Sequence, residues 1–146
     1  MTDRNRVQWL LQAFFTASTT ATFTPGTGGG SALVVTPPYK LRLMSAAGSN
    51  TANGTELTTT GGYTAGGVSL GSVFCAAPTG GVMSNSNTVS WSASGTWAPV
   101  VAIEIWDSAG TPLRWLQGGI TSITGVVNGD TVQFAPAAIS VDASQW

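Results

Sequence analysis

A chain of 146 residues fits one domain with a sizeable core, yet only 8% of its residues are charged, against roughly 25% in a typical soluble domain, and 42% are apolar. This apolar content excludes intrinsic disorder, and a net charge of −1 with only five basic residues leaves no stripe for phosphates, so we expect no nucleic-acid partner. A surface so poor in charge is better suited to being covered by other chains, which predicts assembly.

The first predicted element is a helix that begins after Asp3, a residue type that caps helices. Apolar residues then recur at the spacing of one helix face: Val7, Leu10, Leu11 and Phe14. Residues 16–36 are rich in Thr, Gly and Ala and predict a flexible or extended connection, with a short strand at 33–35. We therefore expect an N-terminal helix and arm over residues 1–36 and a β-sandwich domain over residues 37–146.

Short alternating apolar stretches separated by turn residues predict the strands of that domain. Outside a central hairpin, they lie at residues 39–44, 68–75, 87–92, 120–127, 131–135 and 138–141. Asn128-Gly129 is a strong turn signal before one of them. About eight such strands are typical of an antiparallel β-sandwich or jelly roll, here with one N-terminal helix. No apolar run approaches the ~20 residues of a membrane span, so no membrane partner is expected.

Residues 97–117 predict the central β-hairpin, with turn residues at 107–112. The more apolar face of its first strand is expected to consist of Val101, Ile103 and Ile105. Pairing Ile105 with Leu113 then places Glu104 opposite Arg114 on the less apolar face, and Trp106 on the outer face.

The residues that catalysis usually needs are scarce in this sequence. There is no histidine, and the single cysteine, Cys75, lies in an apolar run that predicts a buried thiol. Glu104 and Asp107 are three residues apart on a strand and turn, so their side chains should diverge, and turn formation accounts for Asp107 and Asp130. We expect no catalytic site, no metal site and no cofactor.

Several segments together resemble a family of small virion structural proteins of tailed phages, which includes tail-fibre, minor structural and capsid decoration proteins. The segments are residues 41–63, 87–91, 97–115 and 127–134, with Gly-Gly-Tyr at 61–63, Ile-Trp-Asp at 105–107 and Gly-Asp at 129–130. The resemblance covers most of residues 39–142. One departure is that Thr64-Ala65 follows Tyr63 where the family usually has a basic residue. The resemblance implies a location in the virion and no catalytic residues.

The leading interpretation is a non-enzymatic virion protein that decorates and stabilises a capsid. The alternative is a structural protein of the tail fibre or tail tip that contacts the host surface. A third interpretation is a carbohydrate-binding module with Trp97 or Trp106 as a sugar platform. Expected partners are other copies of the chain, as a homotrimer by analogy with the family, and the major capsid protein or tail proteins. The residues predicted at interfaces are Trp9, Phe15, Trp106 and Trp146.

Overall fold

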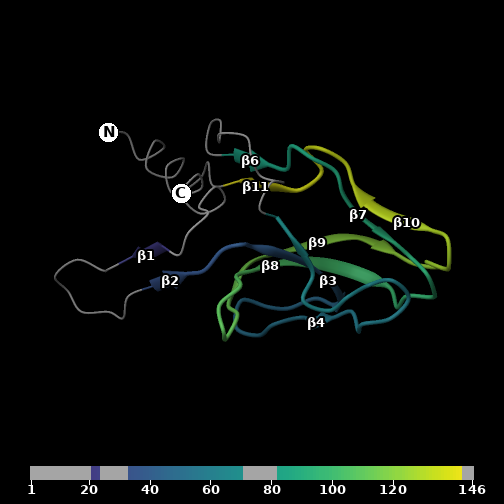
Figure 1. The fold of residues 1–146 in the computed structure, drawn as a ribbon, viewed down its shortest axis with the longest axis horizontal. Coiled ribbons are helices and arrows are strands. Elements are labelled where there is room, and N and C mark those ends of the chain that lie inside the picture. Colours follow the sequence, from purple (N-terminus) through teal and green to yellow (C-terminus); the bar gives the residue numbers. More distant parts are fainter. Residues whose placement is uncertain (1–20, 24–32, 71–81, 143–146) are drawn as a thin grey trace.

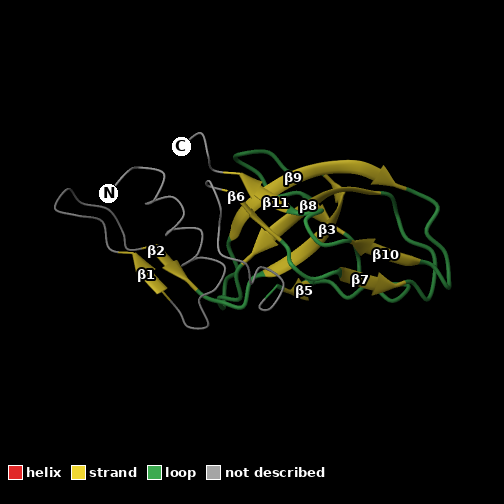
Figure 2. Ribbon diagram, turned by 90° about the horizontal axis from the view of Figure 1, so that it is seen from above, coloured by secondary structure: helices red, strands yellow, loops and turns green. Residues whose placement is uncertain are grey.

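The computed structural model describes residues 21–23, 33–70 and 82–142, and these residues form antiparallel β-structure (Figures 1 and 2). No helix in this part of the chain is long and apolar enough to cross a membrane. The predicted N-terminal helix and Cys75 lie outside the described residues, as do Trp9, Phe15 and Trp146.

The largest element is a five-stranded antiparallel sheet with the order β4-β3-β8-β9, in which β5 also pairs with β3. Its strands are β3 (Lys40–Ala46), β4 (Thr55–Glu56), β5 (Val68–Ser69), β8 (Val100–Trp106) and β9 (Arg114–Ile123). The two short strands share one edge of β3, and β9 forms the opposite edge of the sheet.

Two β-pairs lie on one side of this sheet (Figure 1). They join β6 (Val82–Ser84) to β11 (Ser140–Asp142), and β7 (Val89–Ser92) to β10 (Thr131–Phe134). A separate pair joins β1 (Ala21–Phe23) to β2 (Leu33–Val35). The predicted mainly β, antiparallel class is confirmed, whereas a jelly-roll arrangement is not.

The core lies between the large sheet and the two β-pairs, because alternate residues of each strand face inward. Leu41 and Ile105 pair across the ladder and belong to one apolar cluster with residues of the opposite layer such as Trp91 and Val132. The cluster also includes Tyr63 and Trp97, whose rings meet edge to face at 5.8 Å.

The central hairpin has a different register from the predicted one. Ile105 pairs with Leu116 and Glu104 with Gln117, so the predicted pairing of Ile105 with Leu113 is wrong by three residues. The register shifts between Ile105 and Trp106, where a bulge accommodates the turn, and the Asp107 amide donates to the Leu113 carbonyl.

The face of β8 that carries Glu104 is also more buried than expected. Ala102, Glu104 and Trp106 are all buried, whereas Val101 and Ile103 are only half-buried. The predicted outward position of Trp106 is therefore wrong, since 9% of this residue is exposed. The face is covered because residues 48–56 fold over it and bond to its polar side chains.

The other strands also differ in part from the predicted ones, mostly because several of them are very short. The strand β9 continues to Ile123 and joins two stretches that were predicted separately. The strands β1, β4 and β6 were not predicted as strands, and each has only two or three residues. The turn predicted at Asn128-Gly129 is confirmed, since Gly129 has a φ of 95° and the Asp130 amide donates to the Val127 carbonyl.

Candidate functional site

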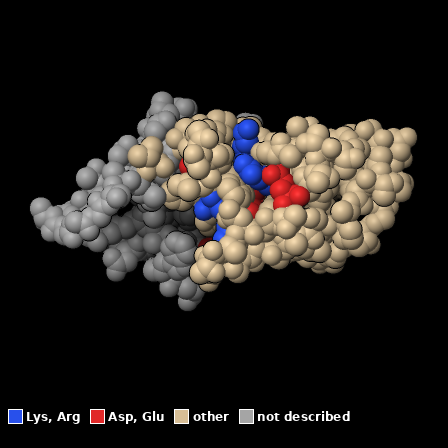
Figure 3. All heavy atoms as spheres, turned by 90° about the horizontal axis from the view of Figure 1, so that it is seen from below, with Lys and Arg blue, Asp and Glu red and all other residues tan. Residues whose placement is uncertain are grey.

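Most charged side chains of the described residues gather on the face of the large sheet that points away from the core. Figure 3 shows Lys, Arg, Asp and Glu atoms near the middle of this face, with mostly uncharged residues around them. The group consists of Lys40 and Arg42 on β3, Glu56 on β4, Glu104 on β8 and Arg114 on β9. The alternation of the strands explains the clustering, because Arg42 pairs with Glu104 and Lys40 pairs with Trp106 in the ladder.

At the centre of this group, Glu104 and Arg114 form a buried ion pair. Oε1 of Glu104 lies 2.9 Å from Nη1 of Arg114, and the side chains are 0% and 12% exposed. The other carboxylate oxygen accepts a hydrogen bond of 2.9 Å from the Trp106 indole. A buried carboxylate is tolerated only when its oxygens are paired in this way.

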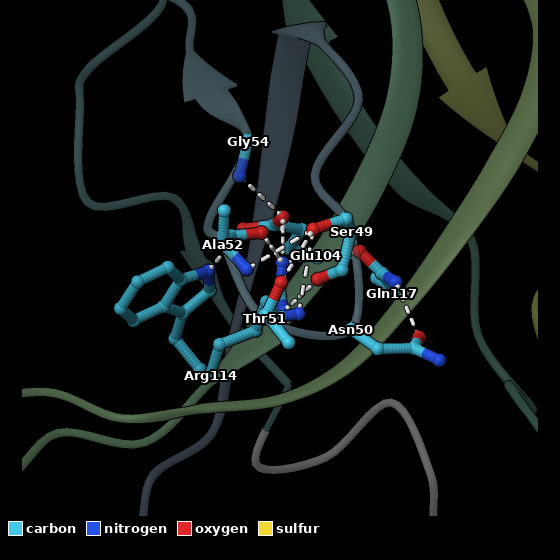
Figure 4. Close-up of polar contacts among 9 residues, drawn as sticks. Ser49, Asn50, Thr51, Ala52, Gly54, Glu104, Arg114 and Gln117 are labelled. Carbon is cyan, nitrogen blue, oxygen red and sulfur yellow. Dashed lines mark hydrogen bonds and ion pairs between the residues drawn. The ribbon is translucent and has the colours of Figure 1, made fainter.

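The ion pair also fixes the loop of residues 48–54, as Figure 4 shows. The Arg114 guanidinium donates to the carbonyl oxygens of Ser49 and Ala52, and Oε1 of Glu104 accepts from the Gly54 amide at 2.9 Å. These bonds join backbone atoms of the loop to side chains of β8 and β9. The loop therefore has a defined conformation although it contains no regular strand.

Two glycines allow the loop to approach the ion pair so closely. A Cβ at Gly48 would lie 2.3 Å from Arg114 Nη1, and a Cβ at Gly54 would lie 2.5 Å from the Ala46 carbonyl oxygen. The backbone could not reach the charged groups with larger residues at these positions. Nothing in the sequence indicated this close contact.

A second polar centre lies beside the first, around the carboxylate of Glu56. Oε1 of Glu56 accepts from the Tyr63 hydroxyl at 2.8 Å and from the Gly66 amide at 2.6 Å, while Oε2 lies 3.2 Å from Arg42 Nη1. The Arg42 guanidinium also stacks on the Trp106 ring, 4.3 Å from its centroid. The two centres are thus connected through Trp106.

Tyr63 completes the edge of the sheet. Its hydroxyl accepts a hydrogen bond of 3.2 Å from the Leu43 amide, between the points where β4 and β5 pair with β3. Burial of the ring raises the pKa of Tyr63, and the hydrogen bond and charge of Glu56 raise it further. The hydroxyl therefore remains protonated and donates to Glu56.

Three further polar side chains, Asp107, Asp130 and Asn85, bond to backbone groups of turns and loops. Oδ1 of Asp107 accepts from the Leu113 amide at 2.8 Å, and Oδ2 of Asp130 accepts from the Val127 amide at 2.8 Å. Asn85 is buried and bonds to the Asn87 and Ala135 carbonyls and to the Ile139 amide. The predicted turn roles of Asp107 and Asp130 are confirmed; the role of Asn85 was missed, because a lone Asn carries no recognisable signal.

This polar group fixes the conformation of the loops at the surface, and its carboxylates are not free to polarise a substrate. The carboxylates of Glu56 and Glu104 are each paired with an arginine and with backbone amides. Within the described residues, no group of three His, Cys, Asp or Glu side chains could hold a metal ion. What the site exposes is an uncharged rim of Ser49, Asn50, Thr51, Asn53 and Gln117.

The structure brings together few of the residues predicted at a site. Trp106 lies inside the polar group, bonded to Glu104 and covered by Arg42. Trp97 is 4% exposed, and its indole donates to the Gly61 carbonyl at 2.6 Å. Neither ring offers an open face for a sugar, so the prediction of a platform at these two residues is wrong.

We also compared the sequence with known protein families. The sequence profile of the family described as Podophage GP4 fiber I protein gp80 matches residues 29–142. The chain belongs to this family. It is therefore a structural protein of a tailed-phage virion, as the resemblance implied. No curated protein and no solved structure gave a significant match.

Proposed function

We propose that this protein is a non-enzymatic structural subunit of a podophage fibre. The family match over residues 29–142 carries the proposal, because the family is described by a fibre protein. Capsid decoration, the leading interpretation from the sequence, lacks a comparable observation. A fibre subunit was the alternative, and it is now the preferred function.

The structure supports a mechanical role for the chain. Its buried ion pair and the Glu56 centre connect β3, β4, β8 and β9 with the loops at 48–54 and 61–67. Such a network holds loops in one conformation and does not leave a reactive group exposed. The rim at residues 49–53 is a rigid, uncharged surface through which the fibre contacts its surroundings.

The partners in this proposal are other copies of the chain and other proteins of the virion. Scarcity of charge supports self-association, since only 8% of all residues are charged and four of the eight charged residues in the described part form ion pairs with one another. Binding of many copies adds weak contacts into a stable assembly.

Location in the virion is the direct test. Gold-labelled antibodies against the chain, applied to intact virions and to separated heads and tails, should label the fibres and the tail fraction. Labelling that covers the head surface and leaves the tail fraction unlabelled would contradict the fibre proposal and favour capsid decoration. An unrelated tail protein of the same phage serves as the fractionation control.

A further inference from the structure

The strand β9 is an open edge of unusual length for this fold. It has ten residues and forms the end of the strand order, so no described strand pairs with its outer side. The segment Leu116–Ser122 contains no charged residue and no proline. Edge strands of monomeric proteins are normally protected by such residues, because an unpaired row of amides and carbonyls recruits another chain.

The opposite edge of the large sheet and the edges of the β7–β10 pair are short. The opposite edge of the large sheet consists of two-residue strands, and the Tyr63 hydroxyl occupies the gap between them. The strands β7 and β10 have four residues each, and Pro136 follows the second. Among the described strands, β9 alone combines a length of ten residues with an edge that no described strand pairs. The strand that matches this edge in length is β9 of another copy.

The centre of β9 fits this pairing. Gly118 and Gly119 are both exposed, and a Cβ added at Gly119 would have no atom within 4 Å. The register with β8 is regular from Leu116 to Gly119, and a shift follows between Gly119 and Ile123. Glycine in a strand interior weakens the isolated strand and often marks the close approach of another backbone. No described residue fills the space at Gly119.

We propose that two copies of this chain pair antiparallel through β9, around a twofold axis that passes at Gly119. In this register residues 116 and 122 of the two copies lie opposite each other, and the uncharged segment pairs with itself over its full length. The contact is isologous and extends both five-stranded sheets into one continuous sheet. Arg114 lies outside the paired segment and keeps its bonds to Glu104 and to the loop.

Charged substitutions at the twofold axis, made in the full-length chain, test this pairing. Gly119→Lys places two like charges opposite each other in the dimer, and Gly119→Glu does the same with the opposite sign. Each variant should weaken dimerisation by at least about tenfold, measured by sedimentation equilibrium. An equimolar mixture of the two should recover association, because the heterodimer places Lys opposite Glu. Neither substitution should alter the circular dichroism of the chain, because a side chain at residue 119 has open space.

Gly110→Lys is the matched control, since this turn glycine also has no atom within 4 Å of an added Cβ. It should leave dimerisation unchanged. The proposal fails if the unaltered chain is monomeric at micromolar concentration, if Gly119→Lys associates as the unaltered chain does, or if the mixture of charged variants does not recover association. These outcomes do not depend on where the protein lies in the virion, so they are separate from the test of the fibre proposal.

Discussion

Glu104 and Arg114 form a buried ion pair across the central hairpin although they do not pair in its strand ladder. Glu104 lies opposite Gln117 and Arg114 lies opposite Trp106, yet the two charged groups meet at 2.9 Å. The bulge between Ile105 and Trp106 brings Arg114 back toward Glu104. The long Arg114 side chain then reaches the carboxylate and the loop of residues 48–54 together.

Removal of the charge at Glu104 should strongly destabilise the protein. Glu104→Gln leaves the Arg114 guanidinium largely buried without its counterion, which costs about 3 kcal/mol. The free energy of unfolding in urea measures this loss. In a double-mutant cycle with Arg114→Gln, the double variant should lose less than the sum of the two single variants. Additive losses would show that the pair does not act as a unit.

The close approach of the loop makes Gly54 sensitive to a single added carbon. In Gly54→Ala the Cβ would meet the Ala46 carbonyl and Oε1 of Glu104, so we expect a loss of about 1–3 kcal/mol in unfolding free energy. Gly110→Ala is the control, because its Cβ would meet nothing, and it should change stability by less than about 0.5 kcal/mol. Equal effects in urea unfolding would contradict the described position of the loop.

Both tyrosines of the chain should resist ionisation in the folded state. Burial raises the pKa of Tyr39 and of Tyr63, and the negative charges of Asp107 and Glu56 respectively add to the effect. Because the folded pKa values lie above the unfolded value of about 10, this contribution to stability is complete below pH 10 and is lost as the pH rises further. Ultraviolet titration should show phenolate only as the protein unfolds. Reversible phenolate formation near pH 10 in the folded protein would contradict the burial.

Deletion of residues 1–35 should leave the β-domain folded and remove its attachment to the virion. In the described residues, β2 pairs only with β1, so the deletion removes no strand of the large sheet. Circular dichroism and urea unfolding test the fold, and incorporation into particles during infection tests the attachment. Normal incorporation of the truncated protein would show that the arm is not the attachment element.

The sequence was sufficient for the β class and for several local features. Alternating apolar residues located β3, β7, β8 and β10, and turn chemistry located the bend at Asn128-Gly129. Strands of two or three residues such as β4 and β6 were missed, because so short a segment cannot show a period of two. Their pairing depends on contacts with distant strands, and these are not visible locally.

The polar site was predicted only in part. The register predicted for the hairpin placed Glu104 opposite Arg114. Their contact is confirmed, but that register was wrong. A bulge shifts every later pair in a strand and has no clear sequence signal at this position. The burial of Trp106 was missed for a related reason, since it depends on a loop whose anchoring bonds go to backbone atoms.

Because the anchoring bonds go to backbone groups, the conformation of the loop does not depend on the side chains that it exposes. Arg114 and Glu104 hold carbonyl and amide groups, which every residue type supplies, so the exposed side chains of Thr51 and Asn53 are not needed for the anchor. Mutations at these two positions can therefore accumulate at little cost to folding. Such substitutions would change the side chains that this loop exposes and leave its scaffold the same.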